Sequence, residues 1–284
     1  MVQMQGGIML IKKNRDRSAY SFANINLLGK CNANCYFCLG KDLPKQFSRY
    51  NQLNVHFHYW RNFNIFLDKC KTLGIAKLYI TGQTADGLQY KYLGELIDFL
   101  QKQTFIVGLR TNGYLALKKM TTIQKMRGEI GYSIHSLRPK INKIIMGKAK
   151  IPNWGKIIPL SGDNVRISIV LTRYNISEFW NLIKYLSTFP NIRYIQIRRI
   201  STDTRYEELR EDIEAYENFY YDFVRNAIPI KTYEGAPVFK FYGKEIVFWR
   251  TVETTANSLN YFTDGTVSDE YFVIEGYLKY KNRI

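Results

Sequence analysis

The sequence predicts an α/β protein in which a parallel sheet is covered by helices on its outside. Three observations support this fold class. Short apolar runs typical of buried parallel strands alternate with helical segments from about residue 22 to residue 200. The chain has 284 residues, enough to bury a substantial core as one large domain or a domain with an appendage. Finally, 46% of the residues are hydrophobic, which excludes a disordered or fibrous chain.

Six strands are predicted from short apolar runs bounded by glycine or polar residues. In chain order they cover residues 22–28, 76–80, 105–109, 129–136, 164–175 and 191–201. Between them, apolar residues at helical spacing predict helices at residues 63–74, 91–103 and 177–189, the first of which ends in Gly74. A further helix is expected over residues 138–147. Asn175 and Glu178, three residues apart, are expected to cap the N-terminus of the last helix.

Residues 201–284 follow a different pattern. A long amphipathic helix is predicted over residues 203–227, with carboxylates and tyrosines interleaved. Alternating apolar residues then predict a hairpin over residues 238–249 that turns at Tyr242 and Gly243. The sequence is therefore divided into an N-terminal segment (1–21), an α/β domain (22–200) and a C-terminal extension (201–284).

The composition is strongly basic. Lys and Arg number 41 and Asp and Glu 24, which gives a formal net charge of +17. Such a charge attracts phosphates, nucleic acid, anionic lipid or an acidic protein, although a basic surface that only aids solubility is an equally open alternative. No apolar run approaches the roughly 20 residues that span a bilayer. The first apolar stretch is followed by charges, unlike a secretory signal, so a cytoplasmic protein with reduced thiols is expected.

Three of the four cysteines lie in one short stretch, CNANCYFC, as Cys31, Cys35 and Cys38. A structural zinc ion would need a fourth ligand. The remaining candidates are Cys70, in a predicted helix, and the His56 and His58 pair. A ferredoxin normally offers four cysteines per cubane cluster. An iron–sulfur cluster held by only three cysteines leaves one iron open for chemistry.

The C-x3-C-x2-C spacing, with Phe37 just before the last cysteine, resembles the signature loop of the radical S-adenosylmethionine (radical SAM) superfamily. The resemblance implies that the three cysteines hold a [4Fe-4S] cluster whose open iron binds S-adenosylmethionine (SAM). Downstream segments agree in order over about two thirds of the chain. TGQT at residues 81–84 resembles the segment that holds the SAM amino group, TNG at 111–113 resembles a strand end of the family, and SIHS at 133–136 resembles the segment facing the SAM ribose.

The resemblance and the residue chemistry together give a set of site residues. For cofactor binding these are Phe37 near the adenine, Thr81, Gly82, Gln83 and Thr84 at the amino group, Asn112, Ser133 at the ribose, and Arg173 at the carboxylate. The two catalytic candidates are His135, which would contact the ribose or act as an acid or base, and Arg198. The arginines follow predicted strands, and a guanidinium grips carboxylate or phosphate in a bidentate fork.

The resemblance also implies a partial (β/α)6 TIM-like barrel with a small C-terminal α+β extension. The carboxyl ends of parallel strands meet at one rim, so the cysteine loop and the strand ends would form a single site. The Asp264–Gly265 turn and Gly276 resemble the extension that in many members carries auxiliary-cluster cysteines, which are missing here. The extension is therefore expected to cap the open end of the barrel without a second cluster, with an ordinary hairpin as an equal alternative.

The chemistry implied by the resemblance is reductive cleavage of SAM to a 5′-deoxyadenosyl radical, which abstracts hydrogen from a substrate. A flavodoxin or ferredoxin would supply the electron. Because only Cys70 remains, sulfur insertion, auxiliary-cluster chemistry and two-cysteine RNA methylation are disfavoured, and a cobalamin domain before residue 22 is not expected.

The substrate is the least determined part of the prediction. The charge favours an anionic substrate, a nucleotide or nucleic acid, and a ribosomally made peptide is the alternative. No RNA-binding signature and no leader-binding module are recognised. A non-enzymatic iron–sulfur or zinc protein that binds nucleic acid is the alternative from another class.

Overall fold

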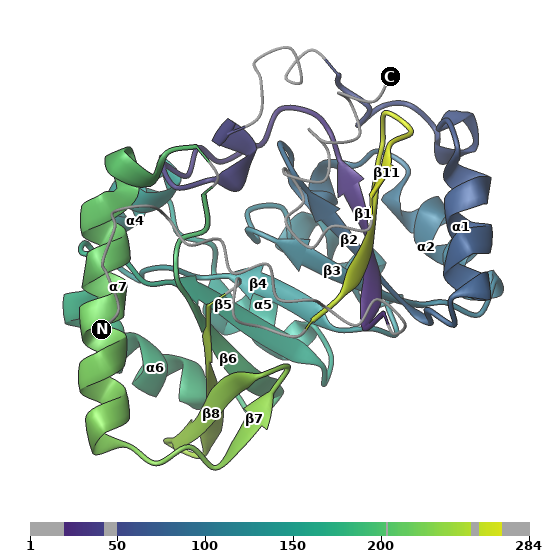
Figure 1. Cartoon of the computed structure of the whole chain (residues 1–284). Helices are drawn as coiled ribbons and strands as arrows, with labels where there is room; N and C mark the ends of the chain where they lie inside the picture. The colour runs from purple at the N-terminus through teal and green to yellow at the C-terminus, as the bar shows by residue number, and fades with distance from the viewer. Residues whose placement is uncertain (1–19, 43–49, 203, 251–255, 269–284) are drawn as a thin grey trace, which may run out of the picture.

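The computed structural model describes residues 20–42, 50–202, 204–250 and 256–268. Within them an eleven-stranded sheet forms the framework, in the order β11-β10-β1-β2-β3-β4-β5-β6-β9-β8-β7 (Figure 1). The six predicted strands are all present and pair in parallel in chain order, which confirms the fold class. They are β1 (Phe22–Leu27), β2 (Lys77–Gly82), β3 (Ile106–Thr111), β4 (Ile130–Ser133), β5 (Val165–Val170) and β6 (Ile192–Arg198).

Helices lie outside the curved sheet (Figure 1). The four predicted helices of the α/β domain are α1 (Phe63–Thr72), α2 (Leu93–Lys102), α4 (Pro139–Met146) and α6 (Phe179–Ser187). Two further short helices were not predicted, α3 (Met120–Ile123) and α5 (Trp154–Leu160), the second with Pro159 inside it. The 3₁₀ helices are η1 (Leu39–Asp42), η3 (Phe57–Tyr59), η4 (Gly87–Gln89), η5 (Leu117–Lys119) and η6 (Ile176–Glu178). None of the helices described is long and apolar enough to cross a membrane.

The two faces of the sheet differ in character because successive strand residues point to opposite sides. In β5, Val165, Ile167 and Ile169 are fully buried in the main hydrophobic core, and Arg166 and Ser168 alternate with them. Burying one aliphatic side chain contributes about 1.5–3 kcal/mol, so the apolar face packed under the helices holds the fold together. The polar side chains on the opposite face of the sheet are available to form a functional site.

A buried ion pair lies on the polar face. Arg166 Nε donates to Glu129 Oε1 at 2.7 Å, and Arg166 Nη1 donates to Gln196 Oε1 at 2.7 Å. The Tyr194 hydroxyl donates to Glu129 Oε2 at 3.0 Å. Burial alone would raise the pKa of Glu129, but the adjacent Arg166 outweighs it and lowers that pKa below its ordinary value. The pair is therefore charged at neutral pH.

The C-terminal extension contains the predicted helix, α7 (Tyr206–Asn226), and the predicted hairpin, β8 (Ala236–Phe241) with β9 (Lys244–Trp249). Tyr242 and Gly243 both have positive φ, 48° and 76°, as a two-residue hairpin turn of the type I′ requires. The further strands are β7 (Lys231–Tyr233), β10 (Ser258–Phe262) and β11 (Val267–Ser268).

The edge positions of these strands were not predicted. β9 pairs in parallel with β6, and β10 pairs in parallel with β1, so the extension lengthens the sheet at both edges. Added strands satisfy backbone groups that would otherwise be left at those edges. Gly276 lies outside the described residues, and the capping role of the extension and the division after residue 200 stay predictions.

Asn175 and Glu178 do not form the predicted helix cap. The Asn175 Oδ1 atom accepts from the Thr172 N–H at 2.7 Å, and its Nδ2 donates to the His135 carbonyl at 2.8 Å. Glu178 precedes α6 without a side-chain capping hydrogen bond. The prediction was wrong because Asn175 has a partner on a neighbouring strand end, which the local sequence does not reveal.

Replacing Arg166 by Leu should lower the free energy of unfolding by about 3–5 kcal/mol, because the change leaves the Glu129 carboxylate buried without its guanidinium. Urea unfolding at pH 7 measures the effect. Arg193→Leu, on the exposed side of the neighbouring strand, is the matched control and should change stability by less than about 0.5 kcal/mol. Equal losses in both variants would contradict the assignment of this pair as a buried one.

Candidate functional site

The cysteine loop follows β1 directly and carries Cys31, Cys35 and Cys38, all half-buried. The Cys38 N–H donates to the Cys35 carbonyl at 3.2 Å, and the Ala33 N–H donates to Cys31 Sγ at 3.4 Å. Burial, and then the neighbouring negative charges that include Cys38, raise the pKa of Cys31 to about 11. Burial and the other two thiols likewise raise the pKa of Cys35. Three thiolates gathered here therefore need a bound cation to be stable.

Asn112 and Asp86 connect the loop to the ends of β2 and β3. Asn112 Nδ2 donates to Asn32 Oδ1 at 2.7 Å and lies 3.6 Å from Cys31 Sγ. The fully buried Asp86 accepts from the Asn112 N–H at 2.7 Å and from the Thr111 hydroxyl at 2.8 Å. Burial raises the pKa of Asp86, although these hydrogen bonds act in the opposite direction. Asp86 thus orients Asn112, a predicted cofactor residue that contacts Cys31.

Gln89 provides a second connection and was not predicted. Its Oε1 accepts from the Asn32 N–H at 3.0 Å, and its Nε2 donates to the Lys30 carbonyl at 3.0 Å. The same Oε1 accepts from the Asp86 N–H, which completes a capping box on η4. The sequence signal was available, since an Asp followed three residues later by Gln is a capping-box pattern.

The end of α4 supports the other side of the loop. The Asn34 N–H donates to the Met146 carbonyl at 2.9 Å, and the Tyr36 N–H donates to the Ile145 carbonyl at 3.2 Å. Gly147, with φ of 71°, ends the helix against Asn34. The helix terminus leaves carbonyl groups without helical partners, and the cysteine loop supplies donors for them.

The TGQT segment lies against the cysteine loop as predicted by its place after β2. Thr84 Oγ1 accepts from the Gly29 N–H at 3.1 Å, and the Gln83 N–H donates to the Leu27 carbonyl at 3.1 Å. Gly82 permits a tight turn, because a side chain there would collide with the Ala85 carbonyl. Thr81, at the end of β2, is in register with Asn26 of β1.

Gly113 of the TNG segment has φ of 77° and is closely packed under the Trp154 ring, so a side chain there would collide with that ring. Ser133, half-buried at the end of β4, is in register with Ser168 of β5. Packing against Trp154 thus explains the glycine at position 113, and Ser133 lies at the end of β4, where the sequence predicted it.

His135 lies beside Phe37, with ring centroids 5.2 Å apart in an edge-to-face arrangement. His135 is 3% exposed, and its Nδ1 accepts from the Val170 N–H at 3.1 Å. Burial, together with the charge of nearby Arg198, lowers the pKa of His135 to about 3. The structure therefore brings three predicted residues, Phe37, His135 and Arg198, to one place beside the cysteines.

Arg173 is placed differently. Its guanidinium forms an ion pair with Glu211 of α7, lies 3.7 Å from Asp212, and donates to the Tyr174 hydroxyl at 2.8 Å. The Tyr36 ring contacts Tyr174 at 5.8 Å between centroids, which is the link between this group and the cysteine loop. The guanidinium is thus engaged with acids of the extension, and its predicted contact with the SAM carboxylate stays a prediction.

The donor set fits an iron–sulfur cluster with an open iron. Three thiols come from one loop, and Cys70 is buried in α1 away from them, where burial raises its pKa to about 12. In the part of the chain that the structure describes, no three or more His, Cys, Asp or Glu side chains converge to hold a single metal ion. A cubane cluster takes one thiolate per iron, so its ligands need not converge on one point.

A parallel sheet with helices outside it and a three-cysteine loop after its first strand is the arrangement that the resemblance to radical SAM enzymes predicts, and solved structures share this fold. SuiB of Streptococcus suis bound to S-adenosylmethionine matches 88% of this chain and 60% of its own chain, with 14% identity and a TM-score of 0.60. SuiB bound to its precursor peptide SuiA matches over the same shares, with 14% identity and a TM-score of 0.59. The predicted resemblance in fold is confirmed.

Coproporphyrinogen III oxidase (HemN) of Escherichia coli, a radical SAM enzyme, matches 86% of this chain and 63% of its own, with 9% identity and a TM-score of 0.46. The chain spans 60% of the length of the SuiB chain that it matches. No protein-family model and no curated protein sequence matches the chain.

His135 should make stability fall at acid pH. In the unfolded chain the pKa of His135 has its ordinary value of 6.5, so the ring takes up a proton as the pH falls below 6.5. In the folded protein the pKa is about 3, and the ring stays neutral until the pH approaches that value. Stability is therefore lost as pH falls through this window, by up to about 1.4 kcal/mol per pH unit. His135→Asn keeps an acceptor for the Val170 N–H and should flatten this dependence in urea unfolding between pH 7 and 5. Equal slopes in the two proteins would show that His135 titrates normally.

Proposed function

We propose that this protein is a radical SAM enzyme in which Cys31, Cys35 and Cys38 hold a [4Fe-4S] cluster. The observation that carries the proposal is the three-cysteine loop, placed where the carboxyl ends of β1 to β6 meet, in a fold shared with SAM-bound SuiB. When bound, the cluster supplies an electron that cleaves SAM to methionine and a 5′-deoxyadenosyl radical. The protein's part is to bind, orient and shield the reacting groups.

Each site residue has a defined task in this proposal. Asn112, held by Asp86, fixes Asn32 and the start of the cysteine loop. Thr81, Gly82, Gln83 and Thr84 line the loop where the SAM amino group would bind, Ser133 faces the ribose, and Phe37 shields the adenine. Arg198 supplies positive charge for a carboxylate or phosphate.

His135 acts as a hydrogen-bond donor in this proposal and not as a base. Because its Nδ1 accepts from the Val170 N–H, the proton of the neutral ring is on Nε2. A pKa of about 3 makes the ring a weak base at neutral pH. The Nε2–H group is therefore suited to a sugar hydroxyl or another neutral acceptor.

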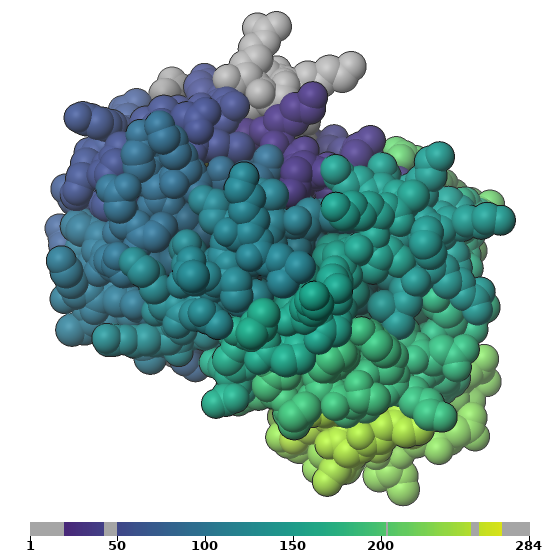
Figure 2. All heavy atoms as spheres, turned by 180° about the vertical axis from the view of Figure 1, so that it is seen from behind, coloured from purple at the N-terminus to yellow at the C-terminus, as the bar shows by residue number. Residues whose placement is uncertain are grey.

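An anionic substrate is favoured by where the positive charge lies. Residues 99–162 contain nine lysines and three arginines against Glu129 alone, and Glu129 is paired with Arg166. Lys140, Lys143 and Lys150 are exposed on and just after α4, the helix that supports the cysteine loop. Figure 2 shows the teal segment of this region bordering the purple segment that follows β1. The same charge would attract an acidic electron donor such as a flavodoxin or ferredoxin in the cytoplasm.

Anaerobic reconstitution with iron and sulfide, followed by reduction and addition of SAM, tests the reaction. The wild-type protein should release 5′-deoxyadenosine, and Cys31→Ala, Cys35→Ala and Cys38→Ala should lose both cluster and product because each removes one ligand of the cluster. Cys70→Ala is the matched control and should keep the iron content, because that thiol is buried in α1. A fully loaded Cys35→Ala protein would reject the ligand set, and a loaded wild type without product would favour the non-enzymatic alternative.

Salt dependence separates a nucleic-acid substrate from a peptide. Binding of a single-stranded oligonucleotide should weaken with added salt, with a log–log slope of about −0.7 per phosphate contact. Lys140→Gln with Lys143→Gln should reduce that slope, and Lys231→Gln on β7, away from the cysteine loop, should leave it unchanged. Tight, salt-independent binding of a neutral peptide with no oligonucleotide binding would favour the peptide alternative, the class of ligand seen with SuiB.

A further inference from the structure

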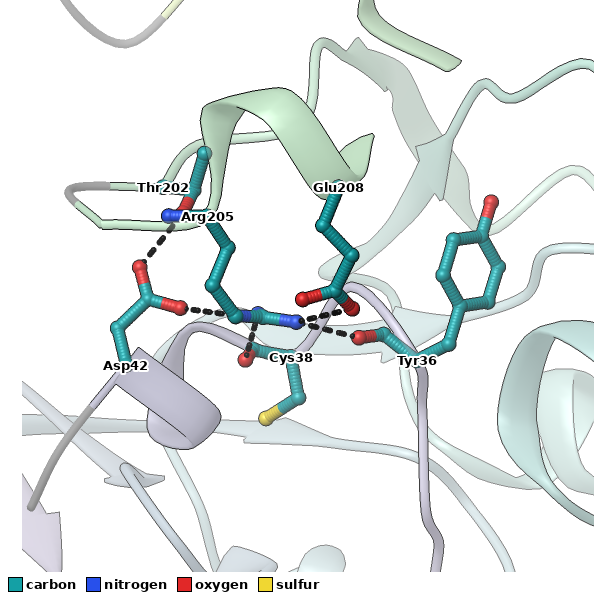
Figure 3. Close-up of polar contacts among 6 residues, drawn as sticks. All are labelled: Tyr36, Cys38, Asp42, Thr202, Arg205 and Glu208. Carbon is teal, nitrogen blue, oxygen red and sulfur yellow. Dashed lines mark hydrogen bonds and ion pairs between the residues drawn. The ribbon is translucent and has the colours of Figure 1, made fainter. Parts of the chain in front are cut away.

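We infer that Arg205 is a positioning residue that fixes the cysteine loop and sets the charge beside its last cysteine, an inference that rests on the proposed cluster. Arg205 lies just before α7, far from the loop in sequence (Figure 3). Its Nη1 donates to the Tyr36 carbonyl at 2.9 Å, and its Nη2 donates to the Cys38 carbonyl at 2.8 Å. One guanidinium therefore holds both backbone groups that flank Phe37.

Asp42 and Thr202 hold the guanidinium in place. Arg205 Nε donates to Asp42 Oδ1 at 2.5 Å, and the Asp42 side chain is fully buried. The Thr202 hydroxyl donates to Asp42 Oδ2 at 2.7 Å and accepts from the Arg205 N–H at 3.0 Å. The side chain of Arg205 is 14% exposed. Thr202 and Arg205 are thus joined to the cysteine loop and to η1 by one connected set of hydrogen bonds.

The geometry requires arginine. Only a planar fork with five donors can reach two carbonyls and a carboxylate at once, and lysine offers a single flexible ammonium. Fixing the carbonyls at positions 36 and 38 restricts the backbone between Cys35 and Cys38, whose own hydrogen bond spans the same residues. The two thiols are thereby held in a defined relative position.

The charges of Arg205 and Asp42 have opposite effects on a cluster. Three thiolates give a bound [4Fe-4S] cluster a net negative charge, which grows when the cluster is reduced. A guanidinium nearby stabilises the reduced form and raises the reduction potential, and a carboxylate lowers it. Arg205 and Asp42 therefore allow a test in which a purely structural role and an electrostatic role give different results.

Four variants test the inference in the full-length, reconstituted protein: Arg205→Gln, Arg205→Lys, Asp42→Asn and, as control, Arg210→Gln, which breaks an exposed pair with Glu207 one turn further along α7. The readouts are iron content, the rate of iron loss to a chelator, and the midpoint potential from an EPR-monitored titration. Arg205→Gln should lose iron more than about tenfold faster, because two charge-assisted hydrogen bonds to the loop are lost, and should have a more negative potential.

The other variants distinguish the effect of the Arg205 hydrogen bonds on iron retention from the effect of its charge on the midpoint potential. Arg205→Lys should lose iron as fast as Arg205→Gln but keep a potential close to the wild type, because the charge remains and the fork is gone. Asp42→Asn should shift the potential in the positive direction, opposite to Arg205→Gln, and Arg210→Gln should change nothing.

Some results would overturn the inference. If both Arg205 variants retain iron and keep the midpoint potential of the wild type, the inference is overturned and the proposed function is unaffected. If Arg205→Gln and Asp42→Asn shift the midpoint potential in the same direction, Arg205 has only a structural role. A wild-type protein that binds no iron would overturn the proposed function and this inference with it. Melting temperatures of all variants identify any that fail to fold, and Arg205→Lys, which keeps the charge, then decides.

Discussion

The parallel pairing of β1 through β6 is the constraint on which the rest of the structure depends. It brings every carboxyl end to one edge of the sheet, so Asn112 and His135, from separate strand ends, reach the loop that follows β1, and Arg198 lies near His135. Parallel neighbouring strands need crossover connections, and the helices in these connections cover the apolar face of the sheet. Polar residues can then occupy the other face without weakening the core.

The cysteine loop has almost no regular structure of its own and is held from three sides. Asp86 and Gln89 attach its start to β2 and β3, the end of α4 supports its middle, and Arg205 holds its last turn. A loop of this kind must hold three thiolates close together, which is unfavourable because burial, and then the neighbouring thiols, raise the pKa values of Cys31 and Cys35. Hydrogen bonds from three separate elements supply that rigidity before any cluster is bound.

The sequence predicted the parts that depend on local pattern. The period of apolar residues gave β1 to β6 and α7, and the Tyr242–Gly243 turn gave the hairpin. It did not predict the parallel pairing of β9 and β10 at the sheet edges, because no local pattern records which edge a distant strand joins. The same reason explains why Arg205 was missed: its contacts with the cysteine loop join segments that are far apart in the sequence.

The distribution of charge connects the cluster site to the proposed substrate. Two buried arginines are paired with acids: Arg166 with Glu129 near the amino ends of β4 and β5, and Arg205 with Asp42 beside the cysteine loop. These pairs restrict each guanidinium to a fixed position and leave little free charge. The lysines around α4, by contrast, are exposed and have few acids near them in sequence. An anionic partner would therefore be attracted by the lysine-rich surface next to the loop, and the interior arginines would set geometry. The net charge therefore bears on the binding of a partner, whereas Arg205 bears on the geometry of the cysteine loop.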